Sequence, residues 1–301
     1  LLAIKAIENG ADKIRINPGN ILKNLKGKTN ADKGEEKMLK KIIRSANKAK
    51  VSIRIGVNSG SLEKHLVDKH GGPTAKALVE SAMNWVLFFE SQKFNNLVIS
   101  IKSTNVQTTI DANELLFKNL KLHAAKTKQK PYPIHLGVTE AGSLISGAVR
   151  SSVALGHLLK KGIGNTIRIS LTEDPVLEVK VAKELLKSLG LYNKEPYIIS
   201  CPTCARTEIE LKPLVKKIEA EIAKLQQSKI AAKLVGENGQ SLKVAIMGCI
   251  VNGPGEAREA DFALFGGKKI GAIYAHGKFV KSVAEKDLVR EFIKVIKAEI
   301  K

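Results

Sequence analysis

Cysteine is scarce in this sequence, and aromatic residues are few. The 301 residues include three cysteines and one tryptophan, and aromatic residues make up 4%. An odd set of thiols argues against a disulfide framework and predicts a reducing compartment, cytoplasmic or plastid-like. No apolar run approaches the roughly 20 residues of a membrane-spanning helix, and we recognise no secretory signal. We therefore expect a cytoplasmic protein without a membrane partner.

Arginine is scarce as well, although the formal net charge is +21. Arginine occurs at eight positions, so 50 − 8 leaves 42 lysines. A charge of this size is typical of nucleic-acid binders, but these lysines are scattered through helical segments and lie in no single block. We expect no nucleic-acid partner, and a positive field that attracts a polyanionic substrate. The alternative, a basic nucleic-acid binder, predicts tight and strongly salt-dependent binding.

The three cysteines lie in two segments, Cys201-Pro-Thr-Cys204 and the stretch that begins at Cys249. Three soft thiolates suit zinc or an iron–sulfur cluster, and both usually take four ligands. The turn formers Asn252-Gly-Pro-Gly follow Cys249 and can fold the chain back, so Glu256 is a candidate fourth ligand. A carboxylate suits such a site less well than sulfur and can yield to an oxygen-bearing substrate, which favours a catalytic cluster.

Simpler interpretations of these segments stay open. CxxC alone is also typical of a redox dithiol or of half a zinc knuckle, so a zinc-stapled binding module is the main alternative. Asn252 can hydrogen-bond a substrate hydroxyl, or it can be a plain turn residue.

The first two thirds of the chain repeat a short apolar run followed by a helical segment. The expected strands are 13–17, 51–58, 97–102, 134–139 and 166–171. The expected helices are 35–48, 73–91, 111–127, 144–161 and 175–189. This repeat predicts parallel strands in about five βα units, whereas a closed (β/α)8 barrel has eight.

A linker between Gly190 and Pro196 divides the chain into domains 1–192 and 193–301. The second domain mixes strands and helices, which predicts an α+β fold with the cysteines on loops at strand ends. Its expected elements are strands at 197–200, 242–247, 261–265 and 270–275, and helices at 207–227 and 285–299.

Four cations mark successive ends of the expected barrel strands, where barrel enzymes carry their catalytic groups. Alternation with isoleucine places them on one face of the strands, pointing into the barrel. Arginine and lysine in this arrangement suit a diphosphate. The alternative is an interior filled by ion pairs. The cations are Arg15, Arg54, Lys102 and Arg168, and Asn17, Asn58 and Ser170 are the polar residues beside them.

Two further residues belong to the fourth expected strand. Glu140 ends it, and a carboxylate among cations stays ionised unless it donates a proton in turn. His135 lies near its start, and we interpret it as a structural histidine.

Six stretches together resemble the family of 4-hydroxy-3-methylbut-2-enyl diphosphate synthases, the iron–sulfur enzymes of the non-mevalonate isoprenoid pathway. They are CPTC (201–204), MGCIVNGPGEAREAD (247–261), RINPGN (15–20), GSLEK (60–64), HLGVTEAG (135–142) and RISLTEDP (168–175). The resemblance covers essentially the whole sequence. It implies a two-electron reductive ring opening of 2-C-methyl-D-erythritol 2,4-cyclodiphosphate to (E)-4-hydroxy-3-methylbut-2-enyl diphosphate, with loss of a hydroxyl as water.

The resemblance also implies a fold and partners. It implies a TIM-type (β/α)8 barrel that is N-terminally incomplete here, because related proteins carry three more strands first. A smaller α+β iron–sulfur domain follows. A chain that lacks those strands would be an inactive fragment of the enzyme, which is a second alternative. Flavodoxin or ferredoxin is the implied electron donor, and a homodimer is the implied assembly.

The roles that the resemblance gives to single residues are these. A [4Fe-4S] cluster is held by Cys201, Cys204, Cys249 and Glu256, and the implied catalytic residues are Glu256 and Glu140, the latter as an acid/base or a hydroxyl contact. The diphosphate contacts are Arg15, Lys102 and Ser170, with weaker correspondence for Asn17, Arg54, Asn58 and Arg168.

Overall fold

The computed structural model describes residues 2–17, 31–228, 234, 241–249, 255 and 258–300, with the side chains of 31–35 left out. The chain divides into two compact units, Leu1–Leu185 and Leu186–Lys301. No helix among the described residues is both long enough and apolar enough to cross a membrane.

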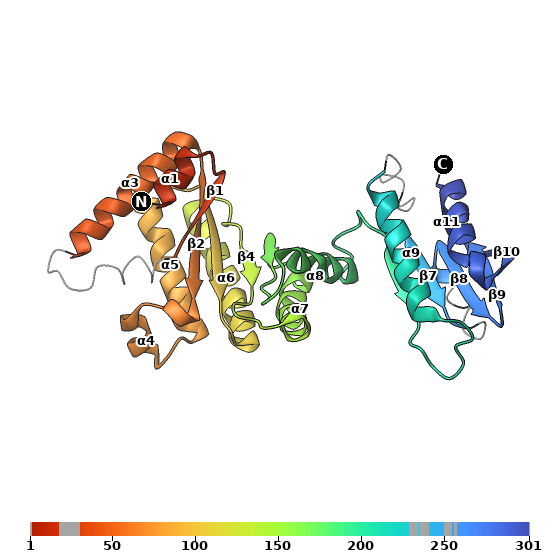
Figure 1. The fold of residues 1–301 in the computed structure, drawn as a ribbon. Coiled ribbons are helices and arrows are strands. Elements are labelled where there is room, and N and C mark those ends of the chain that lie inside the picture. Colours follow the sequence, from red (N-terminus) through yellow and green to blue (C-terminus); the bar gives the residue numbers. More distant parts are fainter. Residues whose placement is uncertain are drawn as a thin grey trace. The chain divides into compact units, whose positions relative to one another are not determined.

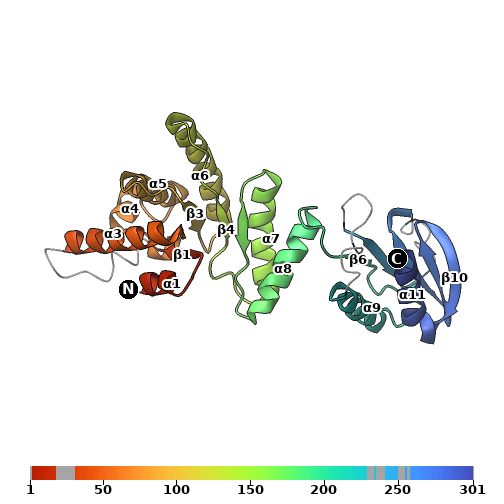
Figure 2. The ribbon, with the colours of Figure 1, turned by 90° about the horizontal axis from the view of Figure 1, so that it is seen from above.

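Unit 1 alternates parallel strands with helices, as Figures 1 and 2 show. Its strands are β1 (Lys13–Ile16), β2 (Ser52–Asn58), β3 (Leu97–Lys102), β4 (His135–Gly137) and β5 (Thr166–Arg168). Its helices are α1 (Leu2–Glu8), α3 (Ala31–Ala49), α4 (Lys64–His70), α5 (Ala75–Ser91), α6 (Val106–Thr127), α7 (Leu144–Lys160) and α8 (Pro175–Ser188), with a short 3-10 turn at Ser59–Ser61.

The five strands of unit 1 form a parallel sheet in sequence order. Strands β1, β2 and β3 pair in register, β4 pairs with β5, and a bridge from Ile99 to Ile134 joins the two groups. The described residues therefore form an open arc of five strands and no closed barrel. β4 and β5 are shorter than the sequence predicts, so Glu140 and Ser170 follow their strands as loop residues.

The two faces of this sheet differ in character. Isoleucines such as Ile53, Ile55, Ile99 and Ile101 are fully buried on the face that α5 and α6 cover. Each buried side chain of this size stabilises the fold by about 1.5–3 kcal/mol. Because side chains alternate along a strand, the polar residues between these isoleucines point to the opposite, inner face.

Unit 2 holds a five-stranded mixed sheet in the order β10-β9-β8-β7-β6. Its elements are β6 (Tyr197–Ser200), α9 (Leu211–Gln226), β7 (Lys243–Met247), β8 (Phe262–Gly267), β9 (Ile270–Ala275), β10 (Lys278–Ala284) and α11 (Leu288–Glu299), with a 3-10 turn at Glu285–Asp287. β6, β7 and β8 are parallel, and β9 and β10 complete an antiparallel meander. The main core lies where α9 and α11 cover one face.

Three sequence-based expectations need correction. β10 and α4 were not predicted, and the helix expected from residue 207 begins at Leu211. β10 carries Lys278 and Lys281 and is an exposed edge strand, where such charges commonly discourage pairing with another chain. Residues 205–210 form turns and loop because they fold back on the end of β7.

Candidate functional site

The inner face of the unit 1 sheet gathers the four predicted cations. Arg15 and Arg54 are level with each other on β1 and β2. The Ile99–Ile134 bridge sets Lys102, at the end of β3, level with Gly137 on β4, and Arg168 pairs with Gly137 from β5. We call Arg15, Arg54, Lys102 and Arg168 the cation layer.

Burial and mutual repulsion shape the charges of the cation layer. Burial, then the charge of Arg168, lowers the pKa of Arg15, and burial, then Arg15 and Arg168, lowers that of Arg54. Lys102 is only 9% exposed, and burial together with the three arginines lowers its pKa from 10.5 to about 7. The layer is therefore a concentration of positive charge that an anion would relieve.

One carboxylate that the sequence analysis missed lies beside this layer. Glu178, in the first turn of α8, is 3.8 Å from Nε of Arg168 and accepts a hydrogen bond from the backbone N–H of Leu171. Its charge raises the pKa of Lys102, against the effect of the arginines. The sequence carries no local signal for this contact, which forms because α8 returns to the end of β5.

The other predicted polar residues occupy separate positions at the strand ends. Asn17 follows β1 and donates from Nδ2 to Oγ of Ser61, while its Oδ1 is buried without a partner in the described part of the chain. Asn58 ends β2 level with Lys102, and Ser170 is half-buried after β5. Glu140 is exposed after β4 in a left-handed conformation with φ 53°, and among the described residues it forms no hydrogen bond or ion pair with the cation layer.

His135 lies below the cation layer and is 7% exposed. Its Nδ1 shares a hydrogen bond with Oγ1 of Thr166, and its Nε2 has no partner within the described residues. Burial and then the nearby cations, Arg54 first, lower its pKa to about 3. The imidazole is therefore neutral at physiological pH.

In unit 2, Cys201 and Cys249 follow the carboxyl ends of the neighbouring parallel strands β6 and β7. The backbone N–H of Gly248 donates to Sγ of Cys201 over 3.2 Å, which ties the two segments together. Cys249 is buried, and Cys204 is exposed. The backbone N–H of Arg206, and then its side chain, lower the pKa of the Cys204 thiol.

Gly248 holds the CxxC loop against β7. Its carbonyl accepts from the backbone N–H of Glu208 at 2.9 Å, and Thr207 donates its own N–H to the carbonyl of Cys204. A Cβ on Gly248 would lie 2.7 Å from Cγ2 of Thr207, so a larger residue here would displace the Thr207 side chain.

The donor set of these loops fits an iron–sulfur cluster. The three thiols lie on the loops that follow two adjacent strands, and N–H groups that point at sulfur stabilise thiolates, the form that binds metal. Within the described ranges, no three histidine, cysteine or carboxylate side chains are grouped to hold a single metal ion. The predicted residues Glu256 and Asn252 lie outside the described residues.

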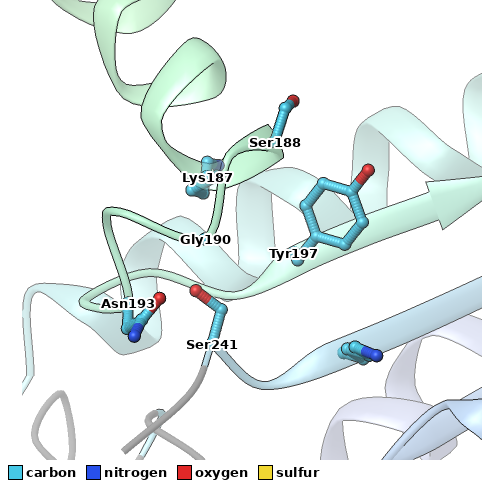
Figure 3. A pocket seen from close by; sticks show the side chains of 7 residues that line it. Lys187, Ser188, Gly190, Asn193, Tyr197 and Ser241 are labelled. Carbon is cyan, nitrogen blue, oxygen red and sulfur yellow. The ribbon is translucent and has the colours of Figure 1, made fainter. Parts of the chain in front are cut away.

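A small hollow lies at the other end of the same strands (Figure 3). Tyr197 and Lys243 line it where β6 and β7 begin, together with the end of α8 and the segment that follows it. The cysteines follow the opposite ends of these strands, so this hollow is separate from the thiol site.

Comparison with known proteins identifies the family. The GcpE TIM-barrel domain matches residues 1–183, and the GcpE protein C-terminal domain matches residues 197–298. The chain belongs to the GcpE family. The fold class is therefore that of a TIM-barrel-type α/β domain followed by a C-terminal domain, as the sequence predicts.

Curated relatives of this GcpE chain share one name, 4-hydroxy-3-methylbut-2-en-1-yl diphosphate synthase (flavodoxin). The protein of Lawsonia intracellularis is 50% identical over 95% of this chain and 70% of its own length. The Malacoplasma penetrans protein is 48% identical over 100% of this chain and 73% of its own length. The Caldanaerobacter subterraneus protein is 45% identical over 100% of this chain and 75% of its own length.

Proposed function

We propose that this chain is a 4-hydroxy-3-methylbut-2-en-1-yl diphosphate synthase. Its substrate would be 2-C-methyl-D-erythritol 2,4-cyclodiphosphate, opened with uptake of two electrons and loss of one hydroxyl as water. The observation that carries the proposal is the identity of 45–50% over 95–100% of the chain with relatives of that name. The cation layer supports it, because it supplies the positive field that a cyclic diphosphate needs.

The two parts of the chain would have different functions. Residues 1–192 would bind the diphosphate through the cation layer with Asn17, Asn58 and Ser170, and residues 193–301 would carry the metal site. Arg15, Arg54 and Arg168 can donate forked hydrogen bonds to phosphate oxygens, and Lys102 adds a point charge. An anion between them would also favour the protonated form of Lys102.

Cys201, Cys204 and Cys249, with Glu256 as the fourth ligand, would hold a [4Fe-4S] cluster. When bound, such a cluster would supply electrons one at a time, with flavodoxin or ferredoxin as the donor. Glu140 would hydrogen-bond a substrate hydroxyl or transfer its proton, Glu256 would act in catalysis besides holding metal, and Asn252 would contact the substrate. A homodimer in the cytoplasm completes the proposal.

The test is to measure iron, acid-labile sulfide and zinc per chain on protein purified without oxygen. Conversion of the cyclic diphosphate is then measured with reduced flavodoxin. Near-equal iron and sulfide together with turnover are expected. Stoichiometric zinc without sulfide would instead support the zinc-stapled binding module. Iron and sulfide without turnover would contradict the enzymatic assignment for this chain.

A further inference from the structure

Two glycines face the cation layer from neighbouring strands. Gly56 lies on β2, two residues beyond Arg54 on the inner face, and Gly137 lies on β4 level with Lys102. In both places the strand next to a cation presents no side chain. The space that a side chain would fill is taken by the cation itself.

The fit between Gly56 and Arg15 is close. A Cβ built on Gly56 would overlap Nε of Arg15 and lie 3.1 Å from both Cζ and Nη2. Nη2 of Arg15 also donates a hydrogen bond to the Gly56 carbonyl over 3.2 Å. The backbone of β2 therefore fixes part of the guanidinium's donor set, at a place that a side chain on residue 56 would occupy.

Gly137 plays the same part for Lys102. A Cβ on Gly137 would lie 2.6 Å from Nζ and 2.8 Å from Cε of Lys102, and 2.9 Å from the Arg168 carbonyl. Real Cβ atoms do not approach other atoms so closely, so any larger residue would push the ammonium away. The buried position of Lys102 beside the three arginines thus depends on the missing side chain of its neighbour.

We propose that Gly56 and Gly137 are positioning residues that set where Arg15 and Lys102 present their charges to the bound anion. Neither glycine touches the anion, and each acts through the cation that lies over it. The identity of that anion, a cyclic diphosphate, rests on the proposed function. The placement of the two cations does not depend on it.

Gly56→Ala is the sharper variant, because the atoms that its methyl group would meet belong to one flexible side chain. Calorimetric titration with the cyclic diphosphate is expected to show affinity weakened by about 10- to 100-fold, the effect of losing one charge-assisted hydrogen bond. Arg15→Met should weaken binding at least as much, and the double variant should lose no more than Arg15→Met alone. Losses that multiply in the double variant, or unchanged affinity in Gly56→Ala, would overturn the proposal.

A second readout needs no substrate. The chain has eight arginines, so their Nε–H signals are few enough to resolve by NMR. The Arg15 signal should move in Gly56→Ala and stay in place in Gly156→Ala, a control whose methyl group would meet only Leu185, at an ordinary 3.8 Å. An unmoved Arg15 signal overturns the assignment of Gly56 as a positioning residue. A moved signal in a protein that does not bind the cyclic diphosphate rejects only the proposed function.

Gly137→Ala extends the test to Lys102. The methyl group would also meet the Arg168 carbonyl, so a lower Tm is expected together with weaker binding. A displaced ammonium would be better solvated, so the pH above which binding weakens should rise. A lower Tm with an unchanged pH profile would overturn the assignment of Gly137.

Discussion

Both units place their polar chemistry at the ends of parallel strands, but they support it differently. In unit 1 the cation layer projects from β1, β2, β3 and β5 themselves, over a sheet whose other face is fully buried. In unit 2 the thiols lie on the loops after β6 and β7, joined by the contact between Gly248 and Cys201. The first arrangement is fixed by the sheet, and the second depends on turns.

This difference affects how much each site destabilises the free protein: the cation layer keeps charges close together, whereas the thiols lie on loops. The strands hold the cations close together in the free protein, where burial, followed by the charges of the three arginines, lowers the pKa of Lys102. Loop-borne thiols can rearrange, and a bound metal group contributes its own binding energy to ordering them. Unit 1 is therefore preorganised for an anion, whereas unit 2 would be completed by the proposed cluster.

The largest expected effect tests whether the two units act independently. Cys249→Ser removes a thiol just after β7. We expect loss of bound iron and sulfide and a decrease in turnover of at least about 1,000-fold, since a proposed ligand of the cluster is gone. Because the cation layer belongs to the other unit, the affinity for the cyclic diphosphate should change by less than about threefold.

Metal analysis and calorimetric titration on the same preparation measure the loss of iron and sulfide and the affinity for the cyclic diphosphate. Thr203→Ser, an exposed change within the CxxC loop, is the matched control and should keep its iron. If Cys249→Ser also abolished binding of the cyclic diphosphate, the independence of the two sites would be wrong.

The second prediction concerns pH and Lys102. The free protein loses the Lys102 proton near pH 7, whereas a bound anion retains it, so binding should take up a proton. Affinity for the cyclic diphosphate should fall by up to about tenfold per pH unit above pH 7. Lys102→Met should bind about 100-fold more weakly at pH 6.5 and show no such slope.

The same lysine gives a stability test with a definite sign. Its folded pKa of about 7 lies below the ordinary 10.5, so the unfolded chain binds the extra proton between these values. Stability should therefore rise with pH across that range. Below pH 7, Lys102 is protonated in the folded protein and its destabilising effect is complete. Lys102→Met should raise Tm at pH 7, with a gain that shrinks toward pH 10. A lower Tm in this variant would show that the lysine is not repelled in the free protein.

The sequence predicts the unit 1 architecture well because its signals are local. The isoleucine alternation in Ile53, Ile55 and Ile99 gives both the strands and their inner faces, and hence the meeting of the four cations. The parts it missed depend on contacts between distant segments. Glu178 reaches Arg168 only because α8 returns to the sheet, and Gly56 and Gly137 matter only through the neighbouring strand.

In unit 2 the sequence predicts the positions of Cys201 and Cys249 at strand ends, which the fold places as expected. It did not predict that residues 205–210 stay non-helical. That outcome depends on the backbone bond from Glu208 to Gly248 and on Thr207 packing against a residue without a Cβ. The sequence did not predict β10, because this exposed edge strand lacks the apolar pattern by which strands are recognised.

The smallest expected effect concerns Glu178 and its influence on the charge of Lys102. Glu178→Gln removes a negative charge that favours protonation of Lys102, while the amide oxygen can still accept from the Leu171 N–H. At pH 6.5, where Lys102 is mostly protonated, the loss of a charge that opposes the anion should improve affinity about two- to threefold. The pH at which affinity begins to fall should move down by a few tenths of a unit, because the pKa of Lys102 falls further.

Calorimetric titrations at several pH values and two salt concentrations measure both shifts. Glu114→Gln is the matched control, since Glu114 pairs with His157 and Lys161 on the helices and should leave the profile unchanged. Arg168 is more than half exposed, so added salt should reduce the effect of Glu178→Gln. Added salt should have a much smaller effect on the pH dependence of affinity that the buried Lys102 causes. An upward shift of the profile in Glu178→Gln would contradict this prediction, because it would mean that the negative charge of Glu178 does not favour the protonated form of Lys102.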